Sequence, residues 1–211
     1  MTAEPSPAAP KPPWWKNIFV LSFIVGIVML SALPILQRRF LKAPPPIRSL
    51  PAWEFQTLKG EPVGSKQLAG KVWLFSLVPG PCDPQCLERQ QAFGRALQHV
   101  DDLHGRVELV TFVLPEGKDS LGPLAQGAAP SWHFAVGSMD ELRPLIDAFR
   151  NGWELFAQTD AGATAEAFAS LPGYGLVDEE NALRGFWRDD VAGRGNAINA
   201  ARLLAQYGPR P

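Results

Sequence analysis

Hydrophobic and polar residues follow one another along this chain in patterns that predict an ordered series of strands and helices. Residues 53–56, "WEFQ", alternate apolar with polar side chains, as a half-buried strand does. The stretches Lys71–Val78 and Val107–Leu114 are apolar almost throughout, which is typical of strands buried on both faces. Between them, the apolar residues of Pro84–Val100 recur at helical spacing. The order strand, helix, strand predicts a parallel, right-handed βαβ unit.

The second half of the chain continues this alternation. Residues 132–137 predict a third buried strand. An amphipathic segment follows, and its opening residues Ser138 and Glu141 have the spacing of a helix capping box. Residues 174–187 predict a hairpin with its turn at "DEEN", and residues 195–208 predict a closing helix.

Residues 18–36, "IFVLSFIVGIVMLSALPIL", are 19 residues without a charge. A helix of that length spans about 28 Å, close to the thickness of the hydrocarbon core of a bilayer. The stretch therefore predicts an uncleaved transmembrane anchor. A cleaved signal peptide is the alternative, but its apolar region is usually shorter and ends at a small-residue cleavage site. Basic residues flank both ends, so these charges leave the orientation open.

The predicted organisation has four parts, with one folded domain. Two segments of that domain predict no clear element: residues 115–131 form a Gly- and Pro-rich loop with at most a weak helix, and residues 151–171 are interpreted as an insertion. The four parts are a disordered tail (1–17), the transmembrane anchor (18–36), a Pro-rich linker (37–51) and the folded domain (52–208).

Charge narrows the range of partners. Residues 47–211 carry 15 Lys and Arg against 20 Asp and Glu, a formal charge of −5. This balance argues against a nucleic-acid partner, which requires a basic surface.

The chain has two cysteines, Cys82 and Cys86, and both lie in "PGPCDPQCLE", directly after the first buried strand. Pro84 between them suits the first turn of a helix, where the helix dipole and free N–H groups favour a thiolate. Residues four apart share a helix face, so the two thiols can close a disulfide or bind one metal ion. Thiolates suit Cu(I) best. Two unrelated, buried cysteines are the alternative, which their placement within five residues disfavours.

In these features the chain resembles the Sco/SenC family of membrane-anchored, thioredoxin-like proteins with a Cys-x-x-x-Cys motif. The matching segments are the amino-terminal apolar stretch, "VWLFSLV", "GPCDPQCLE", "VELVTFVL", "HFAVGSMDELRPLIDAFR" and "YGLVDEENALRGFW". The resemblance implies an α/β, thioredoxin-like fold, with a central mixed sheet flanked by helices, after an N-terminal transmembrane helix.

The resemblance also implies a function. Cys82 and Cys86 would bind copper, or cycle between dithiol and disulfide, while the dinuclear copper centre of cytochrome c oxidase is assembled. The expected partners are the membrane and an oxidase subunit or another exported thiol protein. The expected location is the inner (plasma) membrane, with the domain on its periplasmic, extracytoplasmic side.

The sequence departs from the family pattern at the third copper ligand. The resemblance implies a histidine near Phe168–Pro172, where the chain reads "FASLP", and no histidine occurs after His133. The Asp-Pro that the family has after the second strand is also missing, because "VLPEG" stands there. The cysteines therefore match the family site, and a third ligand stays unknown.

Other residues that could bind a metal have more ordinary interpretations. We expect His99 and His104 to be solvated near the end of the first helix, and His133 to be structural in the third core strand. The acidic run Asp178–Glu180 lies between two strands, where a turn is expected, and carboxylates suit Cu(I) poorly.

Three functional hypotheses follow. The first is a Sco-like assembly factor that uses Cys82 and Cys86 on copper or on the thiols of a partner. The second is a metal-free thiol–disulfide oxidoreductase acting on exported proteins, in which Cys82 attacks and Cys86 resolves the mixed disulfide. The third is a tethered binding domain with a structural disulfide, although so small a loop would stabilise the fold little.

Overall fold

The computed structural model describes residues 18–40, 44–103, 105–159 and 173–207. Its contacts divide the chain into two compact units, Met1–Lys42 and Ala43–Pro211. The first unit contains helix α1 (Ile18–Phe40), which includes the stretch predicted as a membrane anchor. Over the part of the chain that the structure describes, no helix has the length and apolar character needed to cross a membrane.

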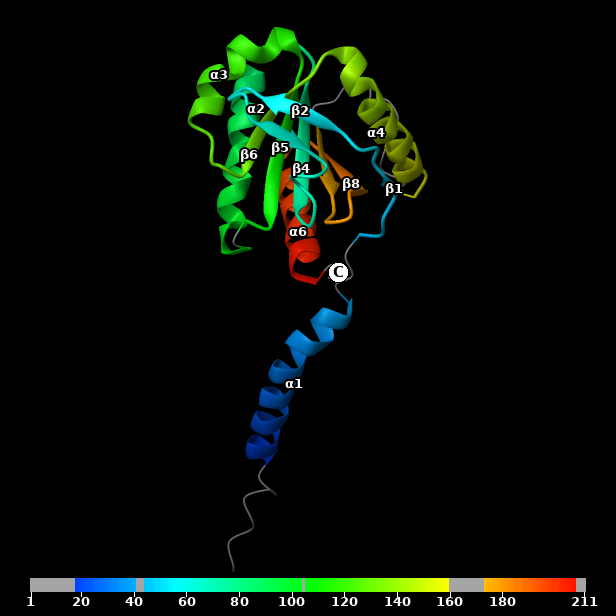
Figure 1. The fold of residues 1–211 in the computed structure, drawn as a ribbon. Helices are drawn as coiled ribbons and strands as arrows, with labels where there is room; N and C mark the ends of the chain where they lie inside the picture. The colour runs from blue at the N-terminus through cyan, green and yellow to red at the C-terminus, as the bar shows by residue number, and fades with distance from the viewer. Residues whose placement is uncertain (1–17, 41–43, 104, 160–172, 208–211) are drawn as a thin grey trace, which may run out of the picture. The chain divides into compact units, whose positions relative to one another are not determined.

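An eight-stranded mixed sheet forms the centre of the second unit, in the order β1-β8-β7-β4-β5-β6-β2-β3 (Figure 1). Strands β4, β5 and β6 are parallel to one another, and the pairs on either side of them are antiparallel. The predicted βαβ unit is therefore confirmed. The strands are β1 (Arg48–Ser49), β2 (Glu54–Thr57), β3 (Pro62–Gly64), β4 (Val72–Val78), β5 (Val107–Val113), β6 (Trp132–Val136), β7 (Gly173–Val177) and β8 (Ala182–Arg188).

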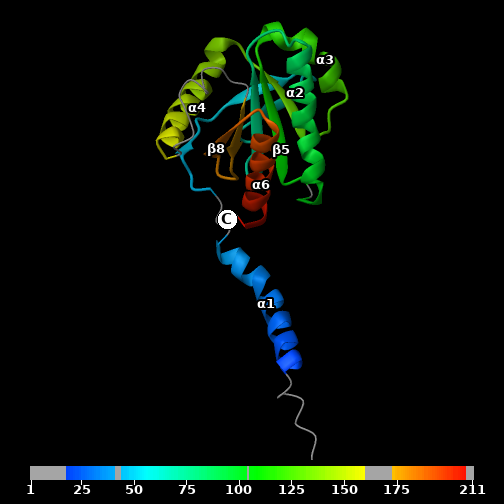
Figure 2. The same cartoon turned by 180° about the vertical axis from the view of Figure 1, so that it is seen from behind.

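Helices cover both faces of this sheet. Figure 2 shows α2 and α6 on one face, and α4 lies on the other (Figures 1 and 2). The helices are α2 (Pro84–Gly94), α3 (Lys118–Gln126), α4 (Met139–Thr159) and α6 (Val191–Tyr207), with 3-10 turns η2 (Arg95–His99), η3 (Asp101–Leu103) and η4 (Pro115–Gly117).

Three predicted segments differ from the structure. The helix predicted for 84–100 keeps α-helical geometry only to Gly94, which packs against the Trp132 ring without room for a Cβ, and continues as 3-10 turns. The predicted loop 115–131 contains helix α3. The helix after β6 extends to Thr159 and takes in the first part of the predicted insertion at 151–171, whose remainder lies outside the described residues.

Each face of the sheet has its own hydrophobic core. The first core packs apolar residues of α2, α3 and α6 on the sheet, including Phe93, Leu121 and Leu204. The second packs α4 on the opposite face, where Phe149 stacks on Phe75 with ring centroids 4.1 Å apart. Because both faces are covered, β4 and β5 are buried almost throughout, and this explains their continuous apolar sequence.

The acidic run at 178–180 forms the turn between β7 and β8, as predicted. The Asp178 carboxylate accepts hydrogen bonds from the N–H groups of Glu180 (2.9 Å) and Ala182 (2.8 Å). It also pairs with the buried Arg184 guanidinium at 2.5 Å. The run therefore closes the hairpin.

A buried carboxylate ties the parallel strands together near their amino ends. Glu108 of β5 is bonded to the Lys71 ammonium at 2.5 Å and to the His133 ring of β6 at 2.9 Å. Burial by itself raises the pKa of Glu108, but hydrogen bonds and charge from His133 and Lys71 outweigh it and lower that pKa below its ordinary value. The interaction therefore stabilises the fold above the ordinary glutamate pKa, and is lost as the pH falls through the lowered value.

We predict that Glu108→Gln lowers the free energy of unfolding at pH 7 by about 1–2 kcal/mol, because it removes a paired, buried charge. Urea unfolding of both proteins between pH 3 and 7 measures this. The difference should shrink as the pH falls below the ordinary glutamate pKa and through the lowered pKa of Glu108, because Glu108 of the parent protein then takes up a proton. Glu116→Gln, at an exposed position, is the control. A difference in the free energy of unfolding that stays constant over this pH range would contradict the stabilising role assigned to the charge of Glu108.

Candidate redox site at the start of helix α2

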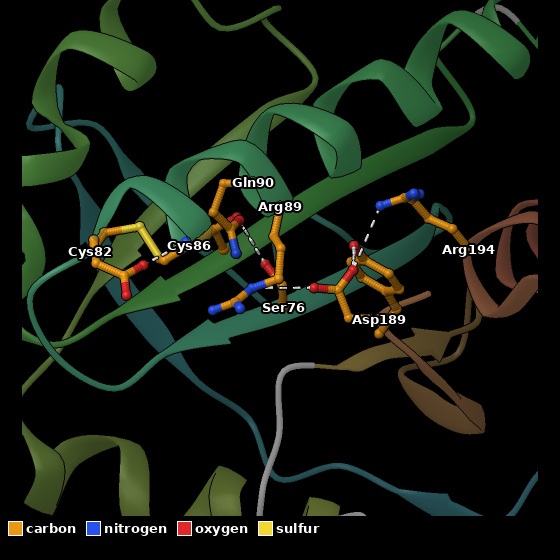
Figure 3. A network of polar contacts seen from close by, with 10 residues as sticks. Ser76, Cys82, Cys86, Arg89, Gln90, Asp189 and Arg194 are labelled. Atoms are coloured by element: carbon orange, nitrogen blue, oxygen red, sulfur yellow. Dashed lines mark hydrogen bonds and ion pairs between the residues drawn. A yellow bond between two sulfur atoms is a disulfide. The ribbon is translucent and has the colours of Figure 1, made fainter. Parts of the chain in front are cut away.

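Cys82 and Cys86 are joined by a disulfide, with their Cα atoms 5.2 Å apart (Figure 3). Strand β4 ends at Val78, a short loop carries Cys82, and helix α2 begins at Pro84. Both cysteines are half-buried and pack against the core beneath α2. The predicted position at a strand-to-helix junction is thus confirmed. The spacing allowed either a disulfide or the binding of one metal ion by both thiols, and the structure shows the disulfide.

The residue between the cysteines caps the helix. Asp83 is the N-cap of α2, and its carboxylate accepts a hydrogen bond from the Cys86 N–H at 2.7 Å. Cys86 is consequently the third residue of the helix, while Cys82 lies just before the cap. Asp83 is not among the residues predicted from the sequence, although Asp before Pro at a helix start is a recognisable capping signal. This carboxylate occupies the positive end of the helix dipole that would otherwise favour a thiolate.

A second element fixes the loop that carries Cys82. The Cys82 N–H donates to Ser120 Oγ of helix α3 at 3.0 Å, and the Ser120 hydroxyl donates to the Gly117 carbonyl at 2.9 Å. Gly117 itself lies so near the loop that a Cβ would come within 2.8 Å of the Gly80 carbonyl oxygen. No local pattern could have revealed these contacts, because they join residues 38 positions apart.

Beneath the helix, a buried polar network attaches its second turn to the sheet. Gln90, one turn after Cys86, accepts hydrogen bonds through Oε1 from Ser76 of β4 (3.1 Å) and Thr111 of β5 (3.2 Å). The Trp132 indole N–H of β6 donates to Thr111 Oγ1 at 3.0 Å. Because these groups are buried and paired with one another, the network fixes the position of α2 over the three parallel strands.

An ion cluster also holds the second turn of this helix (Figure 3). Arg89 Nε lies 3.3 Å from the buried carboxylate of Asp189, which also pairs with Arg194 at 3.6 Å and accepts a hydrogen bond from the Tyr174 hydroxyl. The Tyr174 ring stacks on Phe93 of α2 with centroids 4.8 Å apart. Burial, with a further contribution from Asp189, raises the pKa of Tyr174, so the phenol stays protonated at neutral pH and is no general base.

The structure keeps the described histidines away from the cysteines. His133 pairs with Glu108 and sits three residues before the end of β6, roughly 10 Å along the strand from the edge where the cysteine loop emerges. His99 is exposed at the end of η2, and His104 lies outside the described residues. The solvated and structural interpretations of His99 and His133 are therefore confirmed.

The segment where a third copper ligand was expected, residues 168–172, also lies outside the described residues. Pairing of β7 with β4, with Gly175 opposite Phe75, brings the start of β7 toward the edge of the sheet where the cysteine loop begins. Among the described residues, no group of three or more His, Cys, Asp or Glu side chains is placed to hold a metal ion. The site as described thus offers two sulfur atoms.

Comparison with known proteins shows likeness in structure and not in sequence. No protein-family model matches the chain, and no curated protein matches it. Among solved structures, BsSco, a member of the Sco family of cytochrome c oxidase assembly proteins with a disulfide switch, superposes with a TM-score of 0.58 at 15% identity, over 79% of this chain and 98% of that one.

Two further structures have the same fold. A SCO1/SenC family lipoprotein from Bacillus anthracis has a TM-score of 0.54 at 18% identity, over 75% of this chain and 95% of its own. The thioredoxin domain of a thiol-disulfide oxidoreductase from Bacteroides vulgatus has a TM-score of 0.52 at 12% identity, over 76% and 98%. The second unit therefore has the thioredoxin-like α/β fold that Sco proteins share, as the sequence motifs predicted.

We predict that Asp83→Asn makes the reduced cysteines react faster with iodoacetamide at pH 7 than in the parent protein. Asparagine caps a helix about as well as aspartate, so this change removes the negative charge beside the thiols and keeps the helix start. Rates from mass spectrometry of quenched samples measure the effect, with Glu88→Gln, one turn further along α2, as the control.

The matched variant Asp83→Ala should lose about 1 kcal/mol of stability, because it also removes the cap. Equal alkylation rates for Asp83→Asn and the parent would show that the carboxylate does not restrain the thiols.

Proposed function

We propose that this chain is a Sco/SenC-like protein whose Cys82–Cys86 pair alternates between disulfide and dithiol, and serves the maturation of the copper centre of cytochrome c oxidase. The observation that carries the proposal is the disulfide itself, at the start of a helix that Gln90 attaches to the sheet and Arg89 attaches to Asp189, just after β8. The likeness in fold to Sco proteins supports it.

The exchange reaction balances with a partner dithiol. A partner thiolate attacks Cys82 Sγ, the bond between the cysteines breaks, and Cys86 leaves as a thiolate. The second partner thiolate then attacks the mixed disulfide and releases Cys82. The partner has been oxidised to a disulfide, and the Cys82–Cys86 pair has been reduced by two electrons. Cys86 suits the role of leaving group, because it lies in the first turn of α2 near the positive end of the helix dipole.

The surroundings of the pair favour a redox role over a purely structural one. A disulfide across three intervening residues closes a very small loop, and such loops restrict the unfolded chain little. Helix α2 is already held by its buried hydrogen bonds and its ion pair with Asp189. The stability of the fold therefore depends little on this bond. For this reason the third hypothesis, a purely structural disulfide, is the weakest.

Copper enters the proposal as cargo of the reduced pair. Two neighbouring thiolates at the start of a helix suit Cu(I), a soft ion. Asp83 offers only a hard carboxylate that already caps the helix. In the proposal, the pair carries Cu(I) through its two sulfur atoms. The partner completes the coordination during transfer.

A metal-free thiol–disulfide oxidoreductase is the second candidate. The absence of histidine from the sequence after His133 favours it, because dithiol exchange needs no third ligand. The likeness in fold to an oxidoreductase domain is compatible with it. Under either candidate, we propose that the domain acts outside the cytoplasm, at the membrane, on an oxidase subunit or another exported thiol protein, because disulfides persist in that environment.

We predict that the reduced full chain binds one Cu(I) in competition with a chromophoric chelator, and that Cys82→Ser and Cys86→Ser each weaken binding at least tenfold. Each substitution removes one of two sulfur ligands, and circular dichroism should show the fold intact. Ser131→Ala is the control. A chain that takes no Cu(I) from the chelator but exchanges its disulfide with glutathione would favour the oxidoreductase, and a chain that does neither would contradict both candidates.

A further inference from the structure

The loop between β4 and α2 is the least regular part of the redox site. Cys86 is held by the geometry of α2, but Cys82 precedes the helix and follows the strand, so neither element's ladder of hydrogen bonds fixes it. Its backbone N–H is bonded instead to the side chain of Ser120, on a different element. The position of one sulfur atom of the pair thus depends on helix α3.

The Ser120 hydroxyl is oriented so that its oxygen can accept the hydrogen bond from the Cys82 N–H. Its single proton is donated to the Gly117 carbonyl at 2.9 Å, so its oxygen lone pairs are left to accept the Cys82 N–H at 3.0 Å. The hydroxyl thereby bridges two backbone groups on different segments. A methyl group at this position would leave both backbone groups without these partners.

Gly117 brings a second, independent contact to the same loop. It is buried, and a Cβ on it would lie 2.8 Å from the Gly80 carbonyl oxygen and 3.1 Å from a methyl carbon of Val113. Residues 115–120 therefore meet the cysteine loop at Gly80 and at Cys82. Two contacts by different chemistry, one packing and one hydrogen bonding, define the position of the loop.

We propose that Ser120 is a positioning residue for Cys82, which holds its sulfur at the distance and angle needed to close the bond with Cys86. The inference rests on the proposed redox function. A disulfide requires narrow limits on the separation and direction of its two Cβ atoms, so a restraint on Cys82 raises the effective concentration of one thiol near the other. Loss of the restraint favours the dithiol, and leaves the fold of the reduced protein nearly unchanged.

The test is the equilibrium of the full chain with reduced and oxidised glutathione, measured for the parent, Ser120→Ala and Ser120→Thr. An ordinary hydrogen bond corresponds to a change of about two- to tenfold in an equilibrium constant. We expect Ser120→Ala to lower the constant for disulfide closure by that factor and Ser120→Thr, which keeps the hydroxyl, to restore it to within about twofold. Ser131→Ala, in the turn before β6, should match the parent.

Gly117→Ala provides a second variant that leaves the hydroxyl in place. Because its Cβ pushes against Gly80, we expect disulfide closure to weaken in the same direction. Melting temperatures of the reduced proteins separate positioning from general loss of stability, because Ser120→Ala should lower the value for the reduced form only slightly.

The outcomes distinguish this inference from the proposed function. If the parent fails to exchange with glutathione, the redox function itself is wrong. If the parent exchanges and Ser120→Ala has the same closure constant, the function stands and the role of Ser120 is wrong. An equal effect of the alanine and threonine variants, or a large drop in the melting temperature of reduced Ser120→Ala, would also overturn the positioning role.

Discussion

The attachment of helix α2 to the sheet through Gln90 is the constraint on which the redox site depends. A buried amide side chain is costly unless its polar groups are paired, and here Ser76 and Thr111 supply donors from two neighbouring strands. These hydrogen bonds fix the helix in position over the sheet, which packing of apolar residues alone does less strictly. Cys86 lies one turn earlier on the same helix, so these hydrogen bonds also fix its position relative to the sheet.

The two sulfur atoms are held by separate parts of the fold. Cys86 belongs to α2, which is also fixed by the pairing of Arg89 with Asp189, while Cys82 belongs to a loop that contacts α3 through Ser120. Breaking the disulfide therefore frees a short loop and leaves the helix attached. The proposed redox role requires that one bond open and close without rearranging the core, and this division of the two sulfur atoms between separate parts of the fold is compatible with it.

The sequence predicted the parts of this site that are local. The βαβ unit follows from hydrophobic periodicity, and the placement of Cys82 and Cys86 follows from their position after β4 with Pro84 in the first helical turn. Ser120 and Asp189 were not found, because each acts across a large sequence separation and a lone Ser or Asp carries no local signal.

Helix α3 shows the same limit of sequence reasoning. One glycine and one proline inside this helix weaken its helical pattern, and its packing on the first core stabilises it nonetheless. A third copper ligand was not predicted from the sequence, and its expected segment lies outside the described residues.

The central claim is that Cys82 and Cys86 form a reversible redox pair in the folded protein. The most direct measurement is the reduction potential of the full chain. The chain is equilibrated in glutathione and dithiothreitol buffers of defined potential, and the reduced fraction is read from the mass of the alkylated protein. We expect one reversible two-electron transition between about −300 and −120 mV, the range of thiol–disulfide exchange proteins. A disulfide that is reduced only below that range, or only when the protein unfolds, would contradict it.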